Sequence, residues 1–141
     1  MTTLSKEEIN RLEIKIEAVE KLSSAEFKVI IANRCWFGIR RKAINLFKKY
    51  SLDKTKDSNA VLFLILEKDQ QISIYGDEGI HQKVGTNHWE LICDQVTAKL
   101  KQNEYADAIA LGIHLIADSL KEHFPAHEDN VNEVSNEIIF E

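Results

Sequence analysis

The sequence is poor in the residues and runs that mark several classes of protein. Its 141 residues include one proline, five glycines and two cysteines. The longest apolar run, residues 60–66, is far too short to cross a bilayer. The opening stretch, MTTLSKEEIN, is polar and lacks the apolar core of a signal peptide. These features predict one soluble cytoplasmic domain with no partner membrane.

Other missing patterns exclude familiar kinds of active site. The sequence has no HExxH or Cys/His zinc pattern, no GxxxxGK[ST] phosphate loop, no GxGxxG and no GxSxG. Cys35 and Cys93 are far apart and form no C-x-x-C pair. In a reducing compartment we expect both to be free thiols without a catalytic role.

The sequence also has fewer basic residues than acidic ones. Lysine and arginine number 18 against 23 aspartates and glutamates, which gives a net charge of −5 at pH 7. Because nucleic acids and anionic membranes are bound by basic surfaces, this charge argues against either as a partner. It is compatible with binding cations.

Hydrophobic periodicity predicts alternating helices and strands. Ser5 and Glu8 form a capping box before the first helix, and Trp36 and Trp89 fall on apolar helical stripes, so both are predicted core residues. The first two predicted helices cover residues 6–21 and 36–50. A third is capped by Thr86 or Asn87 and is interrupted at Asn103, and the last runs from Tyr105 until Pro125 stops it. The predicted strands cover residues 25–32, 59–66 and 72–75.

This order of elements favours a three-layer α/β/α sandwich with a small mixed β-sheet. We assign residues 1–125 to the α/β domain and residues 126–141 to an acidic C-terminal tail. Residues 138–140 of the tail, Ile-Ile-Phe, are apolar and are expected to dock on the domain, either as a short strand or as the cover of an apolar groove.

Three polar segments are predicted to meet at one edge of this sheet. The first two strands are joined by a helical crossover and should be parallel, whereas the third follows a tight turn and should be antiparallel. The starts of the first two strands therefore lie beside the end of the third. The polar residues at these points are Ser23, Ser24, Glu26, Asp57, Ser58, Asn59, Asp77 and Glu78, with Gly76 and Gly79 around the last two.

Carboxylate, amide and hydroxyl oxygens are the ligands that Ca²⁺ and Mg²⁺ prefer. The two glycines permit positive φ and a close approach of the backbone, so the loop could curl around an ion or a phosphate. A simpler interpretation stays open, in which Asp77 caps the following helix and Asp57 and Asn59 are ordinary turn residues.

Several short motifs, taken in order, resemble those of the TPM domain family, and in particular its short bacterial members without a signal peptide or membrane anchor. The similar stretches are residues 23–27 (TSGEI in the family), 58–63 (RNGVLI), 74–80 (IxGDxGI), 88–89 (FW), 112–125 (GIxxxGxxLxxHFP) and 128–138 (DDxNELxDEI). The resemblance implies an α/β/α sandwich and divalent-cation binding, often of calcium, near the acidic loops. Because a phosphatase activity is attached to the plant member of the family, the resemblance also implies a possible phosphatase activity for this chain.

The chain departs from the family motifs at several positions. Family glycines are replaced by Ala25, Ala60, Asn103 and Ala108, and the arginine of RNG by Ser58. These changes weaken the case for phosphate chemistry more than the case for a metal site, because Glu26, Asn59 and Asp77 all remain.

Three hypotheses follow. The first is a metal-binding module, with Ca²⁺ favoured and Mg²⁺ possible, in which Asp77 is the central ligand, Asp57, Glu26 and Asn59 assist, and Glu78 is auxiliary. The second is a metal-assisted phosphomonoester hydrolase, for which we assign no catalytic residue. The third is a non-catalytic domain that binds a protein partner through its acidic tail. Binding ranks above catalysis because the sequence offers no compelling phosphate-holding group near the site.

Overall fold

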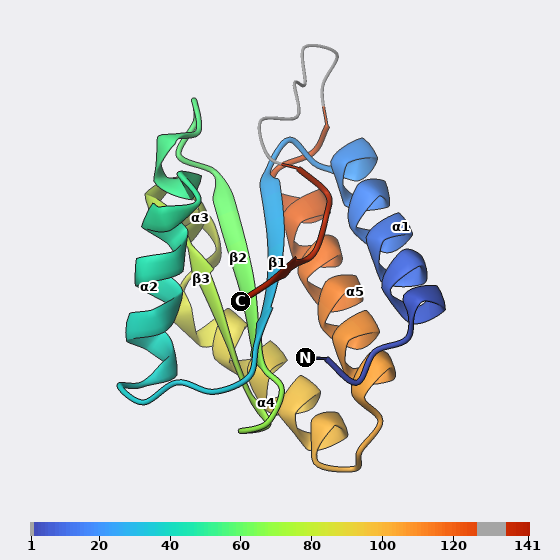
Figure 1. Cartoon of the computed structure of the whole chain (residues 1–141). Helices are drawn as coiled ribbons and strands as arrows, with labels where there is room; N and C mark the ends of the chain where they lie inside the picture. The colour runs from blue at the N-terminus through green and yellow to red at the C-terminus, as the bar shows by residue number, and fades with distance from the viewer. Residues whose placement is uncertain (1, 127–134) are drawn as a thin grey trace.

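The computed structural model describes residues 2–126 and 135–141 and shows a sheet between two helical layers (Figure 1). The helices are α1 (Lys6–Leu22), α2 (Ile39–Lys49), α3 (Glu78–Val84), α4 (Thr86–Leu100) and α5 (Tyr105–His123); the strands are β1 (Glu26–Ala32), β2 (Ala60–Leu66), β3 (Gln71–Gly76) and β4 (Ile139–Phe140); a 3-10 turn spans Leu52–Lys54. Within the described residues, no helix is both long and apolar enough to cross a membrane.

The sheet has the strand order β3-β2-β1-β4. β1 and β2 are parallel, as expected for strands joined by the crossover helix α2. β2 and β3 are antiparallel across a tight turn, and β4 adds in parallel to the other side of β1. The sheet is therefore mixed, as the sequence predicts.

The continuous apolar runs of β1 and β2 reflect burial on both faces of the sheet. Alternate side chains point to opposite faces of the sheet. Val29 and Phe63 pack with α1, α4 and α5 on one face, whereas Ile30 and Leu62 pack with α2 on the other. Figure 1 shows α2 over one face and α1 and α5 over the other. The predicted three-layer α/β/α sandwich is confirmed.

The start of α1 agrees with the sequence prediction, whereas the start of α4 does not. The capping box of α1 is present, with Ser5 Oγ accepting from the Glu8 N–H and the Glu8 carboxylate accepting from the Ser5 N–H. α4 begins at Thr86 itself with Gly85 as its N-cap, so the predicted cap is wrong by one or two residues.

The start of α2 is a larger correction. α2 begins at Ile39 with Gly38 as its N-cap, three residues later than predicted. Trp36 lies in the preceding loop and is 91% exposed, so its assignment to the core is wrong, whereas Trp89 is 5% exposed as predicted. The helical spacing from Trp36 to Ala43 continues across the N-cap, and spacing alone therefore misplaces the start of the helix.

Residues 135–141 lie on the domain, and residues 138–140 include the strand β4. Lys28 Nζ of β1 donates to the carbonyls of Ser135 at 3.0 Å and Glu137 at 2.6 Å. Glu13 of α1 accepts from the Ile138 N–H at 2.9 Å. Burial lowers the pKa of Lys28, which is partly offset by the nearby Glu137 and Glu13 charges. Residues 127–134 of the tail lie outside the described part of the chain.

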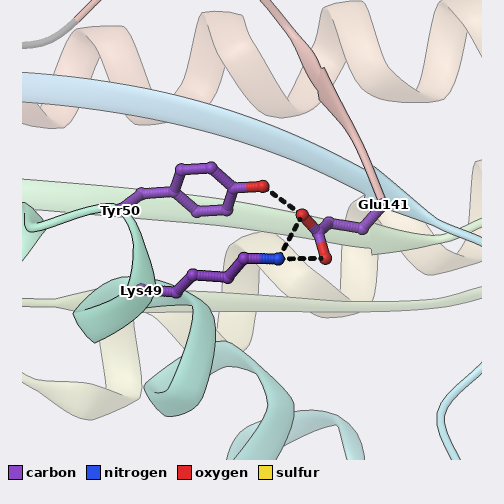
Figure 2. Close-up of polar contacts among 3 residues, drawn as sticks. All are labelled: Lys49, Tyr50 and Glu141. Atoms are coloured by element: carbon purple, nitrogen blue, oxygen red, sulfur yellow. Dashed lines mark hydrogen bonds and ion pairs between the residues drawn. The ribbon is translucent and has the colours of Figure 1, made fainter.

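Glu141 joins this segment to the end of α2 (Figure 2). The Tyr50 O–H donates to the Glu141 carboxylate, and Lys49 Nζ lies 3.1 Å from Oε2 of the same group. The hydrogen bond from Tyr50, followed by the contact with Lys49, lowers the pKa of Glu141 below its ordinary value of 4.5.

We expect acid to weaken the docking of residues 135–141 through this carboxylate. Because the pKa of Glu141 is lowered by folding, its stabilising contribution is present above pH 4.5 and is lost as the pH falls through the lowered value. Hydrogen exchange of the Glu141 N–H, which donates to Ile31 at 2.9 Å, measures the docking. Glu141→Gln keeps an acceptor without the titration, so an unchanged acid response in that variant would contradict the assignment.

Candidate functional site

The three polar segments meet where the topology places them. The register pairs Glu26 with Ala60 and Val61 with Gly76, so the starts of β1 and β2 adjoin the end of β3. Backbone hydrogen bonds connect the segments across this edge. The Glu26 N–H donates to Asn59 O at 3.1 Å, and the Asp77 N–H donates to Ala60 O at 2.9 Å.

Gly79 allows the loop before β2 to lie directly against the start of α3. Its N–H donates to Ser58 O at 3.0 Å, and a Cβ built on Gly79 would lie only 2.6 Å from the same oxygen. Positive φ is found at Gly38 and Gly85 but not at Gly76 or Gly79. Of the two possibilities that these glycines permit, the structure uses the close backbone approach, and this approach is the feature that requires Gly79.

Asn59, which directly precedes β2, is held in place by hydrogen bonds at this edge. It is 4% exposed, its Nδ2 donates to Ser24 O at 2.8 Å, and its own N–H donates to Thr55 Oγ1 at 3.2 Å. Its Oδ1 is buried and has no hydrogen-bond partner among the described residues. The amide is thus oriented by its donor side and leaves its acceptor side available.

Asp77 shows a related pattern. It is the N-cap of α3, and its Oδ1 accepts from the Glu78 N–H at 2.8 Å. The predicted capping role is therefore present. Oδ2 of the same carboxylate is buried and, within the described part of the chain, has no partner. One carboxylate oxygen caps the helix while the other remains available for a ligand.

The other predicted ligands are placed less favourably. Glu26 is buried at 5% exposure, whereas Asp57 and Glu78 are exposed. In residues 2–126 and 135–141, no three side chains from Asp, Glu, His and Cys are grouped closely enough to hold a metal ion. The edge thus brings together Asn59 and Asp77, and the metal-ligand role of the full predicted set stays a prediction.

A cavity of about 250 Å³ opens beside this edge along β3. Its polar lining includes Arg40 of α2, His81 of α3 and Trp89 of α4, whose indole Nε1 lacks a hydrogen-bond partner in the described structure. Sequence reasoning missed Arg40 and Trp89 because they come from helices on opposite faces of the sheet. Trp89 looks like any core residue in the helical pattern.

Cys93 also lines this cavity, at the level of Ile74. Burial raises the pKa of its thiol to about 11, although the Ile74 N–H acts in the opposite direction. A thiol with this pKa stays protonated at neutral pH and is a poor nucleophile.

Comparison with known proteins supports the resemblance to the TPM domain family. The TPM domain family model matches residues 1–119. No curated protein matches the chain. Among solved structures, the NMR structure of BA42 protein from the psychrophilic bacterium Bizionia argentinensis superposes with a TM-score of 0.91 at 26% sequence identity, covering 99% of this chain and 97% of that one.

Two more distant structures share the fold. The N-terminal domain of a P. gingivalis protein gives a TM-score of 0.75 at 15% identity, covering 89% of this chain and 83% of that chain. The N-terminal domain of the cg2496 protein from Corynebacterium glutamicum gives 0.62 at 12% identity, with coverages of 97% and 80%. Because the family model spans residues 1–119 of the 141, the chain belongs to the TPM domain family.

Proposed function

We propose that this TPM-domain protein binds a divalent cation, with Ca²⁺ favoured, at the sheet edge where Asn59 and Asp77 lie. The observation that carries the proposal is the pair of buried oxygens, Asn59 Oδ1 and Asp77 Oδ2, that have no hydrogen-bond partner among the described residues. A buried acceptor without a partner costs about 1–3 kcal/mol. A cation bound by both oxygens would remove that cost.

The chemistry of these donors fits a hard cation. Carboxylate and amide oxygens are typical ligands of Ca²⁺, which also accepts backbone carbonyls and water in flexible geometry, whereas Mg²⁺ demands a near-ideal octahedron. Asp77 and Asn59 would hold the ion. Glu26, Asp57 and Glu78 are retained as the further predicted ligands.

Thermal unfolding with and without Ca²⁺, Mg²⁺ and Mn²⁺ tests the proposal. A ligand at a hundred times its Kd stabilises the folded state by about 2.7 kcal/mol, which corresponds to a rise in Tm of about 5–10 °C for a domain of this size. We expect the largest rise with Ca²⁺. No rise with any of these cations would refute the proposal.

The variants separate metal binding from helix capping. Asp77→Asn keeps a good N-cap but loses the charge, so we expect near-native stability without cation and a reduced Tm shift with it. Asp77→Ala loses both. Asp118→Asn removes an exposed carboxylate that pairs with His114 at the surface of α5, and this variant should respond to Ca²⁺ like the wild type. Equal shifts in Asp77→Asn and Asp118→Asn would locate any binding elsewhere.

The cavity beside the edge favours metal-assisted phosphomonoester hydrolysis as a second candidate. A bound cation supplies positive charge for a phosphate and activates water. Arg40 and His81, which line the cavity, would hold phosphate oxygens and protonate the leaving group. Release of nitrophenolate from p-nitrophenyl phosphate, tested with each cation, should occur in the wild type and be lost in His81→Ala if this candidate is correct. The third hypothesis, an acidic-tail partner, concerns mainly residues 127–134, which lie outside the described structure.

A further inference from the structure

The loop between β1 and α2 presents two aromatic side chains to solvent. Trp36 is 91% exposed and Phe37 is 50% exposed. A Trp side chain with this exposure contributes little of the folding free energy that it would contribute if it were buried. The loop follows the end of β1 opposite Glu26, whereas Arg40, one turn further on in α2, also lines the cavity along β3.

The part of the sequence that contains this loop is rich in basic residues. Seven of the 18 Lys and Arg residues lie in residues 27–52, which contain no Asp or Glu. This segment therefore carries a formal +7, and the rest of the chain, with 11 bases and 23 acids, carries −12. Three of the seven bases face acids from elsewhere in the chain: Lys28 lies near Glu137 and Glu13, Arg34 pairs with Asp69, and Lys49 pairs with Glu141. The charge beside the loop itself comes from Arg40 and Arg41 at the start of α2. α1, with five glutamates between positions 7 and 20, lies across the sheet from α2 (Figure 1).

The basic residues at the start of α2 do not serve the stability of the helix. Arg40 and Arg41 stand in its first turn, which contains no acidic residue, and Gly38 provides no side-chain cap. Cations at this end oppose the helix dipole. The Arg41 guanidinium lies 5.7 Å from the centre of the Phe37 ring, so charge and aromatic surface are held side by side. We call Trp36, Phe37, Arg40 and Arg41 the basic–aromatic tip.

We propose that the basic–aromatic tip docks on the surface of an anionic phospholipid bilayer. Trp and Phe insert at the boundary between headgroups and acyl chains, and Arg side chains contact headgroup phosphates. A protruding loop suits a deformable surface, whereas a protein partner would need a preformed pocket for Trp36. The net charge of −5 describes the whole chain, and it does not exclude a local contact through Arg40 and Arg41 at the start of α2.

Tryptophan fluorescence gives a direct measurement. The chain has two tryptophans, and Trp89 is only 5% exposed, so a change in solvent exposure is reported mainly by Trp36. Titration of the protein with phosphatidylcholine vesicles containing phosphatidylglycerol should shift the emission to the blue and sediment the protein with the vesicles. Phosphatidylcholine alone should do so much less, and added salt should weaken binding.

Variants of the tip distinguish its contribution from general charge effects. Each basic residue near an anionic surface strengthens binding about fivefold, so Arg40→Gln/Arg41→Gln should weaken vesicle binding about 25-fold. Trp36→Ala should weaken it at least tenfold, judged by sedimentation. Lys15→Gln/Lys121→Gln removes two exposed charges from α1 and α5 and should change binding by less than the tip variant. Unchanged Tm values for all three variants would establish that they fold.

The proposal fails if anionic vesicles neither shift the emission nor sediment the protein. It also fails if the two double variants weaken binding equally. A blue shift with single-stranded DNA or an acidic peptide, but not with vesicles, would assign the tip to another class of partner and overturn the lipid assignment.

Discussion

Gly79→Ala is expected to lower the free energy of unfolding by about 2 kcal/mol and to weaken the response to Ca²⁺. The added Cβ would meet Ser58 O at 2.6 Å and Asp57 O at 3.0 Å. Both atoms belong to the backbone, so no side-chain rotation relieves the contact, and overpacking of this kind costs about 1–3 kcal/mol. Separation of the two loops would also displace Asn59 from Asp77.

Thermal unfolding, with and without Ca²⁺, measures both effects of Gly79→Ala. A loss of 2 kcal/mol lowers Tm by about 4–8 °C in a domain of this size. Gln82→Ala, at an exposed position of the same helix, is the matched control and should leave Tm nearly unchanged. Gly79→Ala with native stability would mean that the loop before β2 does not need this close contact.

Gly112→Ala is the second change for which we expect a large loss. Gly112 lies on the buried face of α5, and a Cβ there would clash with Cζ of the Phe63 ring and lie 2.6 Å from its Cε2. Phe63 is fully buried in β2 and has little room to move. Alanine gains about 1 kcal/mol of helix propensity over glycine, but overpacking costs about 1–3 kcal/mol, so we expect a net loss of up to about 2 kcal/mol.

A double-mutant cycle tests the cause of this loss. Phe63→Leu shortens the side chain that the new Cβ would strike, although it also removes core volume. We expect Gly112→Ala to be less destabilising in the Phe63→Leu background than in the wild type, with a coupling energy of about 0.5 kcal/mol or more, as is usual for residues in contact. Additive losses in urea unfolding would mean that the clash with Phe63 is not the reason. Gly79→Ala has no comparable rescue, since its obstacle is backbone.

The sheet could be predicted from the sequence because its signals are local. The apolar runs at residues 60–66 and the alternation around Ile72 and Ile74 define strands wherever the surrounding helices lie. The crossover through α2 then sets β1 parallel to β2, and this relation brings Asn59 and Asp77 to one edge. The family motifs lead to the same arrangement, and the family model match confirms the assignment.

Features that depend on packing between distant segments could not be predicted. Within residues 2–126 and 135–141, Asn59 Oδ1 and Asp77 Oδ2 have no hydrogen-bond partner. This depends on which donors the fold places nearby, and helical or strand spacing carries no information about that. The cavity combines Arg40 and Trp89 from helices on opposite faces of the sheet. Trp36 was misplaced because an apolar residue at helical spacing looks the same on either side of an N-cap.

The attachment of β4 to β1 has a consequence for the time course of folding. The carbonyls that accept from Lys28 lie 107 and 109 residues further along the chain, whereas β1 and β2 can pair as soon as α2 has formed. Contacts between such distant residues form late. Until they do, the side of β1 that β4 will cover is an open, apolar strand edge, the kind of surface on which folding chains associate. The yield of refolded protein should therefore depend on its concentration, and the late step that ends this exposure is the arrival of two residues, Ile139 and Phe140.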